Sequence, residues 1–232
     1  MYKRVLLKLS GEALSDASHS LSQDIIDNTV KSVIALAETG LEIGIVVGGG
    51  NILRGRSSTC VDHNKADQMG MLATAINSLA LQDAFEKFNH KCVVLSSVEM
   101  PVFCERYTSR AALNYLKSGY VVIFACGTGS PFFTTDTGAA LKAAEIGADV
   151  LLLAKNIDAV YSDDPKIDHN AVRYNHLSYN KVINDNLKAT DITAITLCKE
   201  QNIPIHVFAL KDLKNISDGN TAIGTTIDNT EY

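Results

Sequence analysis

The chain has 232 residues, of which 46% are hydrophobic and 20% charged, and its formal net charge is −5. This composition is ordinary for a soluble globular protein. The acidic balance excludes a general nucleic-acid or membrane-surface binder, so any anion site must be a local feature.

The predicted elements alternate between strand and helix. Short apolar runs predict strands, and apolar residues at helical spacing that end near a glycine predict helices. Pro165 lies in a polar stretch, 156–180, for which we expect turns or a small hairpin. The expected strands are 3–10, 42–50, 91–97, 120–130, 148–154 and 203–210, with a closing edge strand at 221–228, and the expected helices are 21–40, 67–88, 110–119, 137–147 and 191–202.

This alternation predicts α/β layers around a mainly parallel sheet. The strands are continuous Val/Ile/Leu runs, as in sheets covered on both faces. No repeat, low-complexity tract or linker interrupts the chain. Ligands bind such sheets at the carboxyl ends of the strands, where the glycines of this sequence gather.

The amino-terminal residues and the cysteines indicate the cellular compartment of the protein. The first apolar run is interrupted by Lys8, which argues against a signal peptide or a membrane span. The five cysteines contain no C-x-x-C pair, and the six histidines lack metal-ligand spacing. We therefore expect a cytoplasmic protein with buried thiols.

The stretch IVVGGGNILRGRS, residues 45–57, ends a strand in three glycines. It does not fit the dinucleotide fingerprint, because Leu53 stands where a glycine is needed. It nearly fits the Walker A pattern, but Arg56 stands in place of the lysine, and a guanidinium does not replace a compact ammonium. A structural strand-to-helix turn remains an alternative.

The missing lysine can come from another strand. Lys8 lies within the first apolar strand and is followed by Ser10 and Gly11. A lysine there is costly unless it meets an anion at the strand end, although an edge-strand lysine in solvent is an alternative. Together with the backbone donors of the glycine turn, Lys8 predicts a phosphate site shared by two strand ends.

Residues 127–140, GTGSPFFTTDTGAA, are the most distinctive segment. Thr135 or Asp136 is the expected N-cap of the following helix, whose first amides would face an anion. Phe132 and Phe133 would form an apolar wall for a planar base, or else anchor the loop in the core. Asp136 would hold lysines in position or orient a metal-bound phosphate, unless it is only a cap.

Two further segments carry candidate contacts. Tyr161 and the acidic pair before Pro165 would pack on an adenosine, or form a polar turn. Asp67, near the start of an expected helix, would accept hydrogen bonds from sugar hydroxyls, or act as another cap.

Taken together, the motifs LLKLSGEAL, VVGGGNILRG, DQMGMLAT, GTGSPFFTTD and VYSDDP resemble those of the bacterial uridylate kinases, within the amino acid kinase superfamily. The resemblance covers nearly the whole chain, from Tyr2 to about Ile227. It implies a single domain over residues 1–232, built as a three-layer sandwich with a mainly parallel central sheet. It also implies transfer of the γ-phosphoryl group of ATP to UMP with Mg²⁺, in pyrimidine nucleotide biosynthesis, by a homohexamer that UTP inhibits.

The resemblance also implies roles for individual residues. The catalytic residues would be Lys8, Asp136, Arg54 and Asp191. ATP would bind to Lys8, Leu9, Ser10, Gly11, Gly50, Arg54, Asn156, Tyr161 and Asp164. UMP would bind to Gly49, Asp67, Thr128, Gly129, Ser130, Pro131, Phe132, Phe133, Thr134 and Thr135. No protein ligand for the metal is expected, because Mg²⁺ would enter with the nucleotide.

The sequence departs from the family pattern in two places. Many members carry a segment with glycine and phenylalanine after GEAL that is associated with activation by GTP, whereas residues 15–24 read SDASHSLSQD. The adenosine segment, KNIDAVY, is one residue shorter than usual and has Ala159 in place of glycine. The adenosine contact of the family therefore falls on either Lys155 or Asn156.

Two other functions stay open at this point. One is a protein on the same scaffold that binds or stores nucleotides or oxyanions without catalysis. The other is a kinase of the same superfamily that acts on a carboxylate or a carbamate. The base-lined Phe-Phe segment favours a nucleotide acceptor.

Overall fold

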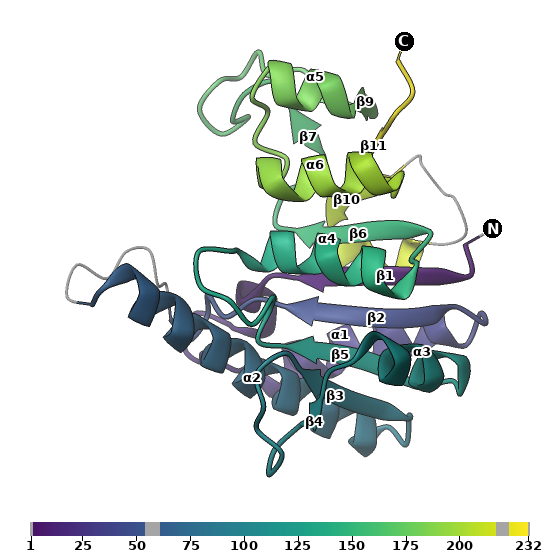
Figure 1. The fold of residues 1–232 in the computed structure, drawn as a ribbon. Helices are drawn as coiled ribbons and strands as arrows, with labels where there is room; N and C mark the ends of the chain where they lie inside the picture. The colour runs from purple at the N-terminus through teal and green to yellow at the C-terminus, as the bar shows by residue number, and fades with distance from the viewer. Residues whose placement is uncertain (1, 54–60, 217–222, 232) are drawn as a thin grey trace.

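A computed structural model describes residues 2–53, 61–216 and 223–231 of the chain (Figure 1). Over these ranges one nine-stranded sheet has the order β4-β3-β5-β2-β1-β6-β10-β11-β9, and β7 and β8 form a separate antiparallel pair. All neighbours in the large sheet are parallel except β10 and β11. The strands are β1 (Arg4–Leu9), β2 (Glu42–Val47), β3 (Cys92–Ser96), β4 (Glu105–Arg106), β5 (Val121–Ala125), β6 (Val150–Lys155), β7 (Val160–Tyr161), β8 (Arg173–Tyr174), β9 (His176–Ser178), β10 (Ile205–Ala209) and β11 (Thr225–Asp228).

Helices cover both faces of the sheet, so the expected three-layer sandwich with a mainly parallel centre is confirmed. One hydrophobic cluster joins the sheet to α3, α4, α5 and α6, and a second joins it to α1, α2 and η3. The helices are η1 (Gly11–Leu14), α1 (Gln23–Ala37), α2 (His63–Lys87), α3 (Ser109–Lys117), α4 (Thr135–Ile146), α5 (Tyr179–Asn184), α6 (Ile192–Gln201) and η3 (Leu210–Asn215).

Alternation along β1 decides where Lys8 points. Val5 and Leu7 belong to the cluster under α1 and α2, while Leu6 belongs to the opposite cluster under α4. Since successive side chains of a strand face opposite sides, Lys8 lies on the α4 face with Leu6. β1 is a central strand between β2 and β6, so the edge-strand alternative for Lys8 is wrong.

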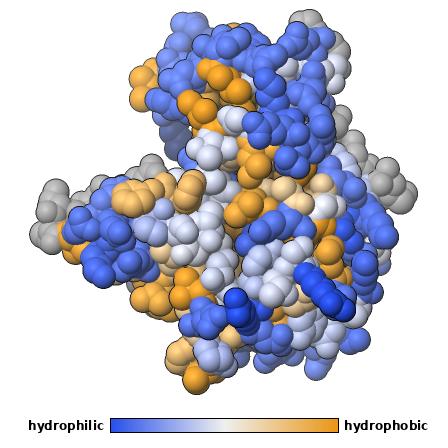
Figure 2. All heavy atoms as spheres, viewed as in Figure 1, coloured by the Kyte–Doolittle hydropathy of each residue, from blue (hydrophilic) through white to orange (hydrophobic). Residues whose placement is uncertain are grey.

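The carboxyl ends of the parallel strands gather at one edge of the sheet. The arrowheads of β1, β2, β5 and β6 point to the same side in Figure 1, the side on which the N-terminus of α2 lies. Figure 2 shows the molecular surface hollowed on this side, between α2 and the part that carries α5. After β5 the chain turns through Cys126 and Gly127, whose φ angles are +63° and +53°. The polar segments that the sequence places after these strands are therefore brought together.

Several elements differ from their predicted bounds. The helix expected at 67–88 begins at His63, because the carboxylate of Asp62 accepts a hydrogen bond from the backbone N–H of Asn64. The helix expected at 137–147 begins at Thr135, and its N-cap is Thr134. The prediction of Thr135 or Asp136 as the N-cap is therefore wrong.

Short elements were missed where the sequence is polar. β4 and β9 have two and three residues, and α5 has six, so none is long enough to show a periodic pattern. The hairpin expected within 156–180 is the β7–β8 pair. No helix of the described ranges is long and apolar enough to cross a membrane.

The four cysteines in the described ranges are free thiols. Cys104, Cys126 and Cys198 are buried, and Cys92 is partly exposed. The fifth, Cys60, lies outside the described residues. Burial raises the pKa of Cys198 to about 12, so this thiol stays protonated at neutral pH.

Candidate active site

The carboxylate of Asp136 lies beside the carboxyl ends of the central strands β1 and β6, and three side chains donate to it. The ammonium of Lys8 lies 2.7 Å from Oδ1 of Asp136, and Lys8 is only 8% exposed. The hydroxyl of Thr190 donates to Oδ2 at 2.7 Å, and Lys155 Nζ lies 3.4 Å from the same oxygen. Lys155 also donates to the carbonyl of Ala189 at 2.6 Å. Asp136 thus holds two lysines from two neighbouring strands.

Asp136 is ionised because of these partners. Burial by itself raises the pKa of its carboxyl group, but the charges of Lys8 and Lys155 and the hydrogen bonds from Lys8 and Thr190 outweigh this effect. The net result is a pKa well below the ordinary value for aspartate. The cluster of two ammonium groups and one carboxylate therefore keeps an excess positive charge, which favours an anionic ligand.

The turns after β1 and β2 lie in close contact, and glycines make this contact possible. A Cβ atom at Gly11 would lie 2.7 Å from the backbone nitrogen of Gly50 and 2.8 Å from the carbonyl oxygen of Gly48, so only glycine fits. Buried Asn77 donates to the carbonyl of Gly48 at 2.6 Å and to Asn51 at 2.8 Å, which fixes the turn.

In the glycine turn after β2, Gly49 is packed against other residues, whereas Gly50 is open to solvent. Gly49 packs on α2, where a Cβ would lie 2.8 Å from that of Ala73 and 2.9 Å from the carbonyl of Gly70. A Cβ at Gly50 would meet nothing within 4 Å, so the backbone there is accessible to a ligand. The structural reading of the turn is thus correct for Gly49, while Gly50 faces open space.

The N-terminus of α4 is tied to the start of α6. The hydroxyl of Thr134 accepts a hydrogen bond from the backbone N–H of Thr137 and donates to the carboxylate of Asp191. Thr137 donates its own hydroxyl to the same carboxylate at 3.3 Å. Asp191 is also the N-cap residue of α6, although its side chain makes no capping bond. The first turn of α4 is therefore held by Asp191 through Thr134 and Thr137, and by Lys8 through Asp136.

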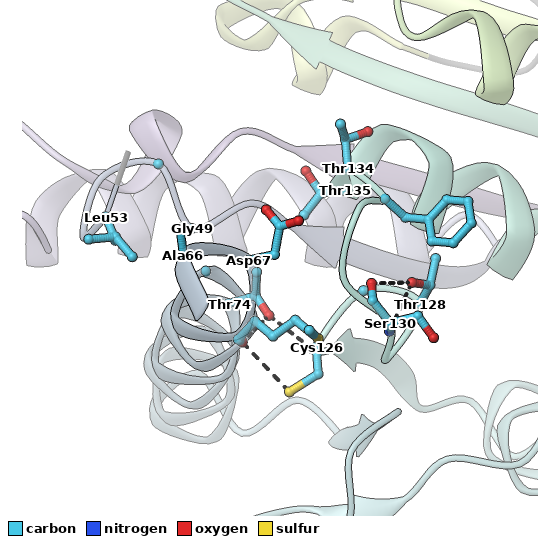
Figure 3. Close-up of a pocket in the computed structure, with 15 residues that line it drawn as sticks. Gly49, Leu53, Ala66, Asp67, Thr74, Cys126, Thr128, Ser130, Thr134 and Thr135 are labelled. Atoms are coloured by element: carbon cyan, nitrogen blue, oxygen red, sulfur yellow. Dashed lines mark hydrogen bonds between the residues drawn. The ribbon is translucent and has the colours of Figure 1, made fainter. Parts of the chain in front are cut away.

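A pocket opens between α2 and the loop before α4. Figure 3 shows Asp67 and Thr135 pointing toward each other, with Gly49 and Ala66 on one side and Thr128 and Ser130 on the other. A helix start, a carboxylate and threonine hydroxyls together suit a ligand with an anionic end and hydroxyl groups. The pocket is lined by Gly49, Gly50, Leu53, Ala66, Asp67, Gly70, Met71, Thr74, Cys126, Gly127, Thr128, Ser130, Phe133, Thr134 and Thr135.

Asp67 links α2 to the loop that precedes α4. Its carboxylate accepts the backbone N–H of Phe132 at 2.7 Å and lies 3.4 Å from Nδ1 of His63. The ring of His63 stacks on that of Phe132, with centroids 5.4 Å apart and planes 7° from parallel. Asp67 lies within α2, four residues after its first residue, so the reading of Asp67 as a cap is wrong.

The two phenylalanines are both exposed. Phe132 is 64% and Phe133 is 52% exposed, which excludes the reading that they anchor the loop in the core. Phe133 lines the pocket, whereas Phe132 packs on His63 at its margin.

A second pocket lies beside the β7–β8 hairpin. The hydroxyl of Tyr161 donates to Asp158 at 2.9 Å, which orients the phenol ring at the pocket wall. This pocket combines an aromatic ring, apolar side chains and carboxylates, a lining typical of small-molecule sites. It is lined by Ile157, Val160, Tyr161, Ser162, Asp163, Asp164, Pro165, Lys166, Asn186, Leu187 and Lys188.

The Lys8–Asp136 pair adjoins residues that line the two pockets. Asp136 directly follows Thr135, which lines the first pocket. It accepts a hydrogen bond from Thr190, two residues after Lys188, which lines the second. The Lys8–Asp136 pair is thus connected through the chain to the linings of both pockets.

Some predicted site residues lie away from this centre. Leu9 points into the core under α1 and α2, so only its backbone is available to a ligand. Asn156 is exposed and donates to Glu12 at 3.4 Å. The carboxamide of Asn156 thus points elsewhere than Lys155, its neighbour, which reaches Asp136. Arg54 lies outside the described residues.

The sequence did not identify all members of the site. The sequence indicates Lys155 only as an alternative to Asn156, and it gives no indication of Thr190 or His63. Lys155 carried a usable signal, since a lysine ends an apolar strand there just as Lys8 does. Thr190 carried no such signal, because its contact with Asp136 joins residues 54 positions apart.

Comparison with known proteins gives consistent results. The model of the amino acid kinase family matches residues 3–209. The chain is 49% identical over 214 residues to the uridylate kinase of Chelativorans sp. (strain BNC1), which covers 91% of this chain and 87% of that protein.

Three solved structures to which this chain is similar are also UMP or uridylate kinases. The crystal structure of UMP kinase from Bacillus anthracis has a TM-score of 0.95 and 36% identity, and covers 99% of this chain and 97% of its own. That of UMP kinase from Ureaplasma parvum has a TM-score of 0.90 and 34% identity, over 98% and 99%. The uridylate kinase of Archaeoglobus fulgidus is less similar, with a TM-score of 0.70, 28% identity, and coverage of 96% and 99%.

Proposed function

This chain belongs to the amino acid kinase family, and from that premise we infer that it transfers the γ-phosphoryl group of ATP to UMP, giving ADP and UDP. The observation that supports this conclusion is the Lys8–Asp136 pair, which adjoins residues lining two pockets of different character. The resemblance to uridylate kinases that the sequence motifs indicate is confirmed by the identity and by the structural matches.

The geometry explains how phosphoryl transfer is promoted. Such transfer needs the two nucleotides in line and the charge on the moving phosphoryl group spread over fixed donors. Lys8, held by Asp136, would carry a preorganised positive charge to that group. The backbone N–H groups at Gly50 and at the start of α4 would add further donors. No strong general base is needed, because the phosphate of UMP is already ionised.

We assign the site residues accordingly. Lys8, Asp136, Arg54 and Asp191 are proposed to serve catalysis. We propose that ATP is bound by Lys8, Leu9, Ser10, Gly11, Gly50, Arg54, Asn156, Tyr161 and Asp164. We propose that UMP is bound by Gly49, Asp67, Thr128, Gly129, Ser130, Pro131, Phe132, Phe133, Thr134 and Thr135. The two pockets support this division, with UMP between α2 and the Phe-Phe loop and adenosine beside the β7–β8 hairpin.

Magnesium is proposed as the metal that accompanies ATP. The donors at the centre are ammonium groups, hydroxyls and backbone N–H groups, and the carboxylate of Asp136 is already taken by Lys8 and Thr190. This donor set fits an ion held mainly by nucleotide phosphates and water, as Mg²⁺ usually is. When bound, Mg²⁺ would neutralise part of the charge on the phosphates.

The decisive experiment is a coupled assay of ADP release with ATP and a series of acceptors. We expect rapid turnover with UMP, slower turnover with CMP, and none with simple carboxylates or carbamate. ADP release with a carboxylate and not with UMP would favour the other kinase reading. Binding of both nucleotides without ADP release would favour a binding or storage protein.

Replacing Asp67 by asparagine is expected to raise KM for UMP about tenfold while KM for ATP changes little. The carboxylate would lose its charge-assisted hydrogen bonds to the ribose, and such bonds are stronger than neutral ones. Steady-state kinetics with each substrate varied in turn provides the measurement, and the KM for ATP serves as internal control. Equal changes in both constants would remove Asp67 from the acceptor site.

We also propose that residues 1–232 act as one domain in a cytoplasmic homohexamer that works in pyrimidine biosynthesis and is inhibited by UTP. A single sheet that runs from β4 to β9 supports the single domain. An exposed apolar stripe on α2 supports assembly: Met69, Leu72 and Ile76 are 44%, 55% and 47% exposed at helical spacing. Figure 2 shows apolar surface over this helix.

Changing both Leu72 and Ile76 to glutamate is therefore expected to reduce the mass of the particle by at least half. Two charges on this stripe would have to be desolvated in an interface. Light scattering after size-exclusion chromatography measures the mass, and Ile167→Glu, an exposed apolar position in a loop, is the matched control. An unchanged hexamer in the double variant would place the interface elsewhere.

A further inference from the structure

The short segment between α5 and α6 contacts the catalytic cluster with three successive residues. The carbonyl of Ala189 accepts Lys155 Nζ at 2.6 Å, the hydroxyl of Thr190 donates to Asp136 at 2.7 Å, and the carboxylate of Asp191 accepts the hydroxyls at the start of α4. Each residue uses a different chemical group and reaches a different partner. The segment therefore contacts Lys155, Asp136 and the start of α4 together.

Thr190 has a distinct position among the three donors to Asp136. Lys8 occupies Oδ1 at 2.7 Å, so Oδ2 is the oxygen left for other partners. At Oδ2 the hydroxyl of Thr190 lies at 2.7 Å, while the ammonium of Lys155 stays at 3.4 Å. The neutral donor thus has the shorter contact, and the charged donor is held more closely by the carbonyl of Ala189 than by the carboxylate.

We propose that Thr190 is a positioning residue for the phosphoryl transfer. Its hydroxyl makes the shorter hydrogen bond to Oδ2 of Asp136, which aims Oδ1 at Lys8 and keeps Lys155 from closing a tight ion pair with the carboxylate. The ammonium of Lys155, held by the carbonyl of Ala189 and only loosely by Asp136, would then direct its remaining donor toward the phosphates of ATP. This assignment rests on the proposed function, and it explains why two lysines at one aspartate differ in their distance from it.

Removal of the hydroxyl has a defined consequence. In Thr190→Val the side chain keeps its shape, but Oδ2 loses its 2.7 Å donor inside a largely buried cluster. A buried carboxylate oxygen without a donor is unfavourable, and Lys155 is the nearest group that can replace it. The variant would then hold both lysines on Asp136, with less positive charge left for the nucleotide.

The test compares Thr190→Val with Thr190→Ser and with Thr196→Val. Thr196 lies on α6, and its exposed hydroxyl donates to the carbonyl of Ile192 at 2.9 Å, so its valine variant is a matched control outside the site. We expect kcat to fall about tenfold in Thr190→Val, the effect of one lost hydrogen bond to a charged group that is partly replaced. The KM for UMP should change less than twofold, since Thr190 is not part of that pocket.

Thr190→Ser should keep kcat within about twofold of the wild type, because the hydroxyl is retained. Thermal unfolding of all three variants controls for a general loss of structure. Wild-type kcat in Thr190→Val would overturn the proposal. Equal losses in the valine and serine variants would also overturn it, because the methyl group and not the hydroxyl would then be responsible.

A second measurement separates this inference from the proposed function. Acetylation of Lys155 in the protein without nucleotide, followed by mass spectrometry, reports how tightly its ammonium is paired. We expect slower labelling of Lys155 in Thr190→Val than in the wild type, and no change in Thr196→Val. Absence of UMP phosphorylation by the wild type would refute the proposed function alone, whereas unchanged labelling would refute the role of Thr190.

Discussion

Replacing Lys8 by alanine is expected to lower kcat by about 10²-fold or more, the typical effect of losing one preorganised donor to the transition state. The fold should persist, because Asp136 keeps the hydrogen bond from Thr190 and the charge of Lys155. The loss should fall on kcat more than on KM for UMP, since the donor acts mainly on the moving phosphoryl group.

The measurement is steady-state kinetics of the purified variant, with circular dichroism to verify the fold. Lys3→Ala is the matched control, because Lys3 precedes the same strand but its side chain is exposed. A folded Lys8→Ala protein with wild-type turnover would contradict the assignment of Lys8 and with it the proposed mechanism.

Replacing Asp136 by asparagine is expected to damage both catalysis and stability. The amide cannot balance two ammonium groups, so Lys8 would remain buried without a counter-charge. Breaking a buried ion pair from one side costs about 3 kcal/mol of unfolding free energy, and kcat should fall by about 10²-fold as Lys8 loses its position. Chemical denaturation and kinetics measure the two effects, with exposed Asp83→Asn as control.

The stability difference between wild type and Asp136→Asn should depend on pH in a defined direction. Burial opposes the charged form of Asp136, but Lys8 and Lys155 lower the folded-state pKa below the ordinary value of 3.8. Such a group stabilises the folded state above its unfolded pKa, and this stabilisation is lost as pH falls through the folded pKa. The difference should thus be full at pH 6 and shrink below about pH 4. A difference that grows on acidification would contradict the ionised assignment.

The long elements were predictable because their patterns are local. Strands such as Val121–Ala125 are continuous apolar runs, and α1 has apolar residues at helical spacing before Gly40. The bounds were less predictable, because they depend on single side chains. Asp62 starts α2 four residues early, and Thr134 caps α4 in place of Thr135 or Asp136.

The site was predictable where a residue is unusual in its local context. A lysine inside an apolar strand, a triple glycine at a strand end and the Phe-Phe loop all stand out from their neighbours. Thr190 does not stand out, because a threonine in a polar loop has many ordinary roles. The partner of His63 depends on how α2 packs against the loop before α4, and the partner of Thr190 depends on how the α5–α6 segment packs against the first turn of α4.

By itself the sequence determined the α/β class, the parallel strands and the polar residues that follow their carboxyl ends, because these properties arise from hydrophobic periodicity and from residue types at known offsets. Only the tertiary structure decided that Lys8 and Lys155, from adjacent strands, share Asp136, and that Thr190 donates to the same oxygen that Lys155 approaches. The reason is physical: the distance between side chains far apart in the chain is set by strand order and helix packing, and the charge balance of a buried cluster depends on those distances.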